Sequence, residues 1–184
     1  MTKAELRRDM RTRLAALGPA RAGKSQAIAT SIAAHPAVLR RRRIALFSPL
    51  PSEPDIEELW KTSPGQFCYP RIVRGELEFV EVARLADLTI SPWHPQIREP
   101  VDPAARIVLP AEIEVILVPG LAFTRRGQRL GRGGGNYDRY LATLRSSTLK
   151  LGVCFAMQIV EMLPTEPHDQ RVDAVATEEG IFAL

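Results

Sequence analysis

Cysteines and aromatic residues are scarce in this sequence. Its 184 residues include two cysteines, and aromatic side chains make up 6% of the total. Cys68 and Cys154 lie in separate strand-like segments without the spacing of metal ligands, so they favour a reducing compartment and exclude a disulfide framework. We expect both residues to be buried thiols.

Long hydrophobic runs are also missing. No apolar run approaches the length that spans a bilayer, and the opening segment, MTKAELRRDMRTRL, is amphipathic without an apolar signal core. We therefore expect a soluble, cytoplasmic protein without a membrane partner. With 184 residues, 45% of them hydrophobic, the chain is long enough for one domain, residues 1–184, with a sizeable core.

Acidic residues are outnumbered by basic ones. The chain carries 25 Lys and Arg against 21 Asp and Glu, and arginine supplies 21 of the basic residues. This balance favours anionic partners, among them nucleotides, polyglutamate and nucleic acid, without choosing between them. The run from Arg40 to Arg43 has no interleaved aromatic residues and abuts a strand-like segment, so it indicates a solvated linker and no nucleic-acid partner.

Short apolar runs alternate with helical patterns along the chain. Apolar spacing predicts helices over residues 2–17, 20–35, 55–60, 137–144 and 157–163, and strands over 44–47, 67–70, 77–82, 107–109, 115–118, 151–155 and 174–177, before a final segment at 181–184. The Pro-rich segment 87–110 is expected to cross the surface where it could cover a ligand. The alternation predicts an α/β fold, a single-domain three-layer α/β/α arrangement with a mixed, mostly parallel sheet flanked by helices.

Glycine is concentrated in one place. Four of the five residues from Gly131 to Gly135 are glycine, between the apolar run Val115–Val118 and a helical pattern that opens at Asn136. Bare N–H groups can close on an anion there, and the next helix adds its positive end, so the cluster is typical of a phosphate cradle at the carboxyl end of a strand. The alternative is a mobile surface loop with solvated arginines. Guanidinium groups, which suit phosphate oxygens, surround the cluster at Arg125, Arg126, Arg129, Arg132 and Arg139.

A second phosphate-loop pattern is contradicted by its context. Residues Gly18 to Ser25, GPARAGKS, satisfy G-x-x-x-x-G-K-S. An amphipathic helix precedes them instead of a buried strand, and Pro19 occupies the first variable position. We interpret the segment as the end of one helix and the start of another, with Lys24 and Ser25 exposed.

Phosphate binding implies a divalent cation, which carboxylates usually hold. Asp138 lies three residues past the last glycine, and Asp173 lies just before the last predicted strand, with Asp169 one helical turn earlier. Each could instead be a helix-cap or turn residue. If Asp138 holds the cation, Asp138→Asn should lower turnover and leave the fold intact.

The segment from Val118 to Leu141 resembles the signature of the 5-formyltetrahydrofolate cyclo-ligase family, roughly P-G-x-x-F-D-x-x-G-x-R-L-G-x-G-x-G-[YF]-Y-D-x-x-L. The matching residues are Pro119, Gly120, Phe123, Gly127, Arg129, Leu130, Gly131, Gly133, Gly135, Tyr137, Asp138 and Leu141. The resemblance extends to both ends of the chain, through Lys3, Leu6, Arg7, Glu53, Val172 and Asp173.

The resemblance implies an ATP- and Mg²⁺-dependent ligase that converts 5-formyltetrahydrofolate to 5,10-methenyltetrahydrofolate, and a monomer. It implies that Lys3 and Arg7 reach the ATP phosphates, which would be wrapped by Arg129, Leu130, Gly131, Arg132, Gly133, Gly134, Gly135, Asn136 and Tyr137. Asp138 and Asp173 would hold Mg²⁺, and Arg129 and Asp138 would act in catalysis. Glu53 would bind the pterin, with Ser48, Trp93, Arg132, Gly133, Gly134, Gly135 and Asn136 near the folate.

Two residues depart from the family pattern. Thr124 stands where the family usually has Asp, and Asn136 replaces an aromatic residue beside Tyr137, which removes stacking surface. Two alternatives therefore stay open. One is an ATP-dependent relative that acts on a different small molecule, and the other, less favoured, is a basic nucleic-acid-binding module.

Overall fold

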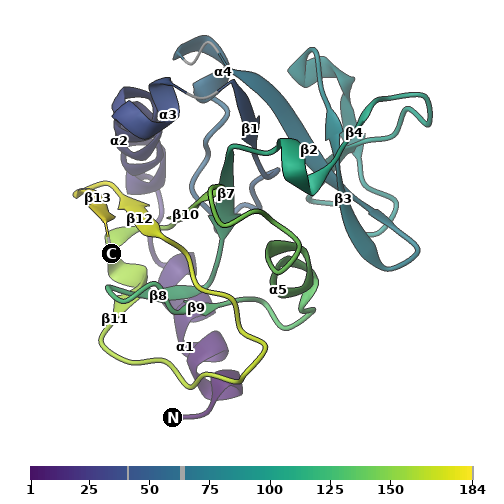
Figure 1. The fold of residues 1–184 in the computed structure, drawn as a ribbon. Coiled ribbons are helices and arrows are strands. Elements are labelled where there is room, and N and C mark those ends of the chain that lie inside the picture. Colours follow the sequence, from purple (N-terminus) through teal and green to yellow (C-terminus); the bar gives the residue numbers. More distant parts are fainter. Residues whose placement is uncertain (41, 63–64, 184) are drawn as a thin grey trace.

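The computed structural model describes residues 1–40, 42–62 and 65–183. Its largest element is an eight-stranded sheet in the order β13-β12-β10-β7-β1-β2-β3-β6 (Figure 1). Strands β12, β10, β7, β1 and β2 are parallel neighbours, whereas β13, β3 and β6 extend the two edges in antiparallel pairs. This confirms the predicted mixed, mostly parallel sheet. The strands span Arg43–Ala45 (β1), Gln66–Val73 (β2), Glu76–Glu81 (β3), Ile107–Val108 (β6), Val115–Pro119 (β7), Leu149–Val153 (β10), Ala174–Thr177 (β12) and Gly180–Ala183 (β13).

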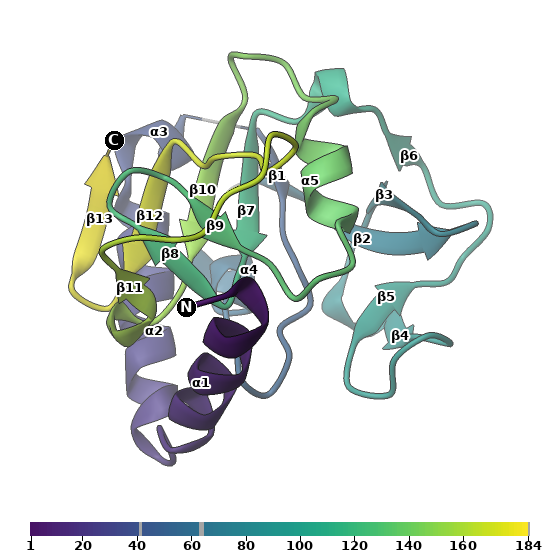
Figure 2. The same ribbon diagram turned by 90° about the horizontal axis from the view of Figure 1, so that it is seen from below.

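Helices cover both faces of this sheet (Figures 1 and 2). In β7, Val115 and Leu117 belong to the core shared with the first helices, while Ile116 and Val118 belong to the core shared with α5. A strand buried on both faces is a continuous apolar run, which is the pattern that predicted it. The predicted α/β/α layers are confirmed. One face carries α1 (Lys3–Ala15), α2 (Ala20–Ala34) and α3 (Pro36–Leu39), and the other carries α5 (Asn136–Leu141).

A capping box sets the start of α1. The Oγ1 atom of Thr2 accepts a hydrogen bond from the Glu5 N–H at 3.3 Å, and the Glu5 carboxylate accepts one from the Thr2 N–H at 2.7 Å. Leu6, Met10 and Leu14 then face the core. The cap fixes where the helix begins and therefore where the side chains of its first two turns point.

The GPARAGKS segment is a junction between α1 and α2, as interpreted. Gly18 turns the chain with a φ of +52°. Lys24 is half-buried and forms an ion pair with Glu178, so the expectation that it is exposed is wrong. The expectation that Ser25 is exposed is also wrong, because it is 4% exposed and its Oγ accepts a hydrogen bond from the Asp55 N–H at 3.0 Å.

Two smaller sheets stand beside the main one. A hairpin of β4 (Leu88–Ile90) and β5 (Arg98–Pro100), preceded by a 3₁₀ turn at Leu85–Asp87, orders part of the Pro-rich segment 87–110. A second 3₁₀ turn, Pro110–Glu112, ends that segment. The other small sheet has the order β11-β8-β9, formed by β8 (Ala122–Thr124), β9 (Arg129–Leu130) and β11 (Ile159–Val160).

The helix predicted over 157–163 is wrong. A 3₁₀ turn, Ala156–Gln158, leads directly into β11, which pairs with β8. The Gln158 side chain is 1% exposed, and its Nε2 donates to the carbonyls of Gly120 and Leu121 at 2.9 and 3.1 Å. These long-range hydrogen bonds hold the segment in an extended course that apolar spacing alone did not indicate.

The segment after Asp55 also differs from the expectation. The helix predicted over residues 55–60 begins only at Leu59. Oδ1 of Asp55 accepts a hydrogen bond from the Glu57 N–H at 2.9 Å, and the helix that follows among the described residues is α4, Leu59–Thr62. An Asp side chain that bonds the backbone two residues on forms a turn, which competes with helix initiation.

Only part of the arginine run Arg40–Arg43 fits a solvated linker. Arg43 begins β1, and its guanidinium lies 3.4 Å from the carboxylate of Glu81. Arg41 lies outside the described residues, as does Leu184, the last residue of the predicted C-terminal segment.

The two cysteines are free, buried thiols, as predicted. Burial raises the pKa of the Cys68 thiol to about 12 and also raises the pKa of Cys154. Among the helices of the described residues, none has the length and apolar character needed to cross a bilayer.

Candidate active site

A cavity of about 650 Å³ opens beyond the carboxyl ends of β1 and β7, the edge at which open α/β sheets bind ligands. The start of α1, the loop after β1, the β2–β3 hairpin, the segment 91–99, the stretch 119–138 and the loop 166–169 all contribute to its walls. One predicted site residue, Asp173, does not line the cavity. Those that do are Lys3, Arg7, Ser48, Glu53, Trp93, Arg129, Leu130, Gly131, Arg132, Gly133, Gly134, Gly135, Asn136, Tyr137 and Asp138.

The glycine cluster forms one wall of the cavity. The β8–β9 hairpin separates it from β7, so the cluster does not follow that strand directly, as the sequence had suggested. Gly133 and Gly135 have φ values of +114° and +68°, conformations that favour glycine. A Cβ atom on Gly133 would lie 3.7 Å from the guanidinium carbon of Arg7. The bare backbone therefore lets the loop approach α1 closely.

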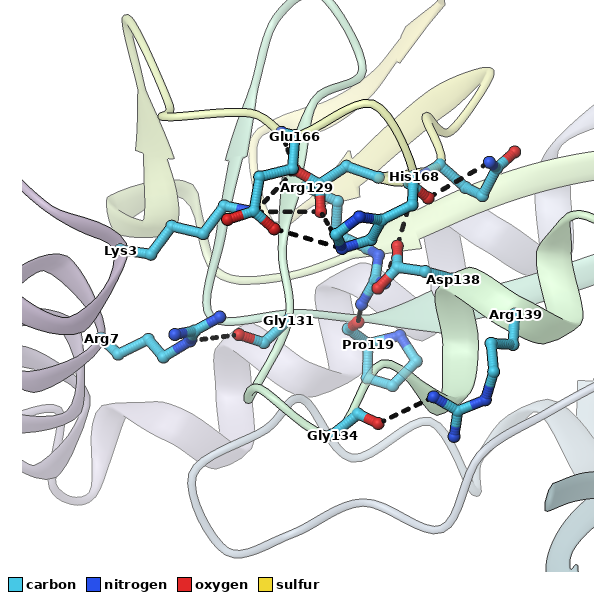
Figure 3. A network of polar contacts seen from close by, with 12 residues as sticks. Lys3, Arg7, Pro119, Arg129, Gly131, Gly134, Asp138, Arg139, Glu166 and His168 are labelled. Atoms are coloured by element: carbon cyan, nitrogen blue, oxygen red, sulfur yellow. Dashed lines mark hydrogen bonds and ion pairs between the residues drawn. The ribbon is translucent and has the colours of Figure 1, made fainter. Parts of the chain in front are cut away.

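Two arginines hold this loop through its carbonyl groups (Figure 3). The Nε of Arg7 donates to the Gly131 carbonyl at 2.9 Å, and Nη1 of Arg139 donates to the Gly134 carbonyl at 3.2 Å. Arg139 also donates to Oδ1 of Asn136 at 2.6 Å. Because these contacts use loop carbonyls, they leave the loop N–H groups as donors for an anion.

The expectation that Arg125 and Arg126 surround the cradle is wrong. Neither lines the cavity, and the Arg125 guanidinium lies over the ring of Phe182, 4.4 Å from its centroid. Thr124, where the family usually has Asp, accepts hydrogen bonds on Oγ1 from the N–H groups of Arg126 and Gln128, both at 3.2 Å. The hydroxyl thus holds the β8–β9 turn and has no part in the cavity.

Arg132 joins the glycine loop to the loop after β1. Its Nε donates to Oε1 of Glu53 at 2.9 Å, and its Nη2 donates to Oγ of Ser52 at 3.0 Å. Glu53 is 6% exposed, and its Oε2 accepts a hydrogen bond from the Leu50 N–H at 2.9 Å. Both oxygens of this buried carboxylate therefore have partners.

An ion pair joins the buried side chain of Arg129 to the partly exposed Asp138 at 2.7 Å (Figure 3). The Arg129 side chain is 3% exposed and also donates to the Pro119 carbonyl at 3.3 Å. Asp138 accepts from Arg129 and from the Gln170 N–H on Oδ1, while its Oδ2 has no hydrogen-bond partner among the described residues. The adjacent Tyr137 ring centroid lies 5.8 Å from the Arg129 guanidinium carbon, and burial raises the pKa of its hydroxyl.

Lys3 meets a group of acids at the other side of the loop (Figure 3). Its Nζ lies 2.7 Å from Asp169 and 3.2 Å from Glu166. Burial alone would lower the pKa of Lys3, but the hydrogen bonds to Asp169 and Glu166 outweigh it and raise that pKa. The ligand atoms of Glu166, His168 and Asp169 lie within 4.8 Å of one another.

Asp173 stands apart from this arrangement. Its Oδ2 accepts a hydrogen bond from the Lys150 N–H at 2.8 Å, and its side chain is 47% exposed. The Asp173 N–H donates in turn to the Lys150 carbonyl at 2.8 Å, which anchors the residue beside β10. Asp138 and Asp173 therefore do not line the cavity together, whereas Asp169 does line it.

The remaining walls are more apolar. Ser48 is 8% exposed and accepts a hydrogen bond from the Arg98 N–H at 2.9 Å, and Trp93 lies at the rim with 67% of its surface exposed. Sequence reasoning missed Glu99, which lines this part of the cavity and is 6% exposed. Glu99 belongs to the Pro-rich segment, where neither a motif nor periodicity marks it. Sequence reasoning also missed Glu166 and His168, because neither a motif nor periodicity marks them.

Together, the fold and the cavity define an α/β protein whose ligand site combines a glycine loop, cationic side chains and buried carboxylates, a set suited to an anionic ligand. A model described as the 5-formyltetrahydrofolate cyclo-ligase family matches residues 1–178. The chain belongs to the 5-formyltetrahydrofolate cyclo-ligase family.

Individual relatives cover most of the chain. The 5-formyltetrahydrofolate cyclo-ligase of Escherichia coli K12 is 33% identical over 168 residues, 85% of this chain and 89% of that protein. The mouse protein of the same name is 28% identical over 193 residues, 97% of this chain and 94% of that protein. The NMR structure of Aquifex aeolicus 5,10-methenyltetrahydrofolate synthetase superposes with a TM-score of 0.87 at 30% identity, covering 100% of this chain and 93% of that one. A synthetase from Mycoplasma pneumoniae shares the fold, with a TM-score of 0.77 at 23% identity over 97% of this chain and 99% of that one.

Proposed function

We propose that this chain catalyses the ATP-dependent conversion of 5-formyltetrahydrofolate to 5,10-methenyltetrahydrofolate, with release of ADP and phosphate. Family membership supports the reaction. The structural observation that carries the proposal is that a glycine loop with adjacent cations and an apolar wall containing buried carboxylates face each other in one cavity. One end suits a triphosphate and the other suits a pterin ring with its N–H donors.

The proposed ATP site is the end of the cavity between α1 and the glycine loop. Lys3 and Arg7 extend from successive turns of α1, and residues 129–137 would surround the phosphates with guanidinium and N–H groups. Lys3 is paired with Asp169 and Glu166. We expect bound phosphates to compete with these carboxylates for its ammonium group.

The acids at this end fit Mg²⁺, which takes oxygen ligands and usually one or two carboxylates together with substrate phosphates. Asp138 would hold the ion through Oδ2, since its Oδ1 already accepts hydrogen bonds. Asp173 does not line the cavity, and its Oδ2 is held by the Lys150 N–H, so its carboxylate would have to move toward the cavity to join Asp138. Bound there, Mg²⁺ would neutralise charge on the phosphates during transfer of the γ-phosphoryl group.

The proposed chemistry has two steps. The formyl oxygen attacks the γ-phosphorus as the bond to the ADP oxygen breaks, and N10 then loses its proton and bonds to the formyl carbon while phosphate leaves with the former formyl oxygen. An amide-like oxygen is a weak nucleophile, so the chain must hold it in line with the γ-phosphorus. Arg129 and the loop N–H groups would stabilise the transferring group, and Glu53, Ser48 and Trp93 would hold the pterin.

The direct test is formation of the methenyl chromophore from 5-formyltetrahydrofolate, followed by absorbance with and without ATP and Mg²⁺. We expect product only when both are present, with ADP formed in equal amount. A folded chain that binds ATP yet forms no methenyl product would contradict the proposal, and would favour a relative that acts on another small molecule.

Two adjacent arginines of α1 provide matched variants. Arg7 contacts the glycine loop, whereas Arg8 is exposed and does not line the cavity. Charge-assisted hydrogen bonds contribute about 1.5–3 kcal/mol each, so Arg7→Gln should raise the KM for ATP by roughly 10-fold or more. Arg8→Gln should leave that KM unchanged. Equal effects of the two substitutions would remove Arg7 from the proposed ATP site.

A further inference from the structure

Five carboxylates line the cavity, and four of them contact a cation. Glu53 pairs with Arg132, Asp138 pairs with Arg129, and Asp169 and Glu166 pair with Lys3. The fifth is Glu99. Among the described residues, no hydrogen bond or ion pair joins the Glu99 side chain to another group, although the residue is only 6% exposed.

The position of Glu99 in β5 explains why it has no cation. Successive side chains of a strand point to opposite sides. Arg98, its neighbour in the strand, forms an ion pair with Glu57 away from the cavity. Arg71, a cation that also lines the cavity, already contacts Glu78 at 2.7 Å and the carbonyl of Asp102 at 2.9 Å. Glu99 therefore faces the cavity as an uncompensated acceptor.

Because Glu99 lines the cavity, a ligand that displaces water from its carboxylate must supply a donor in place of that water. Given the proposed function, we propose that Glu99 binds N–H donors of the reduced pterin ring of the substrate. That ring carries N–H groups on its pyrimidine edge and at N8. Both oxygens of Glu53 already have partners in the free protein. Glu99 offers these donors a second carboxylate in the same cavity.

The first experiment compares Glu99→Gln with the native chain by calorimetric titration of 5-formyltetrahydrofolate in the absence of ATP. Loss of charge-assisted hydrogen bonds should weaken folate binding roughly 10- to 100-fold. The affinity for a non-hydrolysable ATP analogue should stay within about twofold, because Glu99 lies outside the proposed phosphate site. Glu179→Gln removes an exposed carboxylate that does not line the cavity, and should leave both affinities unchanged.

Thermal unfolding separates this role from a structural one. Since Glu99 has no partner to lose, Glu99→Gln should leave the Tm unchanged or raise it. Glu53→Gln should lower the Tm, because it weakens the contact with Arg132. A fall in Tm for Glu99→Gln as large as that for Glu53→Gln would assign Glu99 to the scaffold and overturn the proposal.

Analogues of the ligand then test the donor directly. We would measure 2-desamino and 8-deaza forms of 5-formyltetrahydrofolate against the native chain and Glu99→Gln, as a double-mutant cycle between ligand and protein. The proposal expects at least one analogue to bind the native chain more weakly than the parent folate, and to lose no further affinity with the variant. Full additivity for both analogues would overturn it.

These measurements separate a failure of the proposed Glu99 role from a failure of the proposed function. If the native chain binds 5-formyltetrahydrofolate and Glu99→Gln binds it equally well, the role of Glu99 is wrong and the proposed function stands. If the native chain binds ATP but no reduced folate, both are wrong.

Discussion

The ion pair between Arg129 and Asp138 makes a prediction that differs from the one drawn from sequence. As a metal ligand alone, Asp138 could be changed to Asn without affecting the fold. The structure makes Asp138 the charged partner of an arginine whose side chain is 3% exposed. Asp138→Asn should therefore destabilise the protein as well as lower its turnover, because it leaves a buried guanidinium without a counter-charge.

The size of the effect follows from the burial of the pair. Removing one partner of a buried ion pair costs about 3–5 kcal/mol. The Asn amide can still accept a neutral hydrogen bond from Arg129, so we expect about 3 kcal/mol for Asp138→Asn and the upper end of the range for Asp138→Ala. In a protein of this size, about 3 kcal/mol corresponds to a fall in Tm of roughly 6–12 °C.

Urea unfolding followed by circular dichroism, together with thermal melts, would measure this effect in the absence of ligands. Asp173→Asn is the matched control for stability, because its side chain is 47% exposed and it should cost about 1 kcal/mol or less. If Asp138→Asn unfolds at the same urea concentration as the native chain, the ion pair contributes nothing and the reasoning is refuted. If both variants lose stability equally, burial of the pair is not the cause.

Three further results are expected. Burial opposes ionisation of Glu178, but the hydrogen bond from Lys24 outweighs it and lowers the pKa of this carboxylate. The ionised group therefore stabilises the fold above its unfolded pKa near 4.5. In urea unfolding repeated from pH 7 down to pH 3, the difference in stability between the native chain and Glu178→Gln should be full at pH 7 and should shrink as the pH falls. Because burial raises the pKa of both thiols, that of Cys68 to about 12, neither cysteine should react with a thiol reagent at pH 8 until denaturant is added, and rapid labelling of the folded chain would contradict this. Gly152→Ala should cost roughly 1–3 kcal/mol in urea unfolding, since its Cβ would lie 2.6 Å from the Phe123 ring, and an unchanged midpoint would show that the ring can move aside.

Much of the fold could be predicted because local patterns and tertiary structure agree. The run Val115–Val118 is apolar at every position, as a strand covered on both faces must be. Gly18 and the residues around it end one helix and begin the next, which helix-terminus rules anticipate. The glycine cluster was recognisable because few other uses bring so many bare backbone positions together.

The remaining features depend on contacts that are distant in sequence. Gln158 holds its segment extended through the carbonyls of Gly120 and Leu121, and no local pattern reveals such partners. Glu99 stands out only because its side chain has no hydrogen-bond or ion-pair partner among the described residues. In the sequence, Asp169 is one of two aspartates one helical turn apart, with Asp173 as the other. Only the fold shows that Asp169 contacts Lys3 at the cavity.

The pairing of Lys3 with Asp169 has a consequence for the order in which the chain acquires its ligand site. The two residues are separated by 166 positions. At a synthesis rate of about 5–20 residues per second, Asp169 is made roughly 8–33 s after Lys3. During that interval the first helix has no acidic loop to dock against. The proposed nucleotide site can therefore form only near the end of translation or after release from the ribosome.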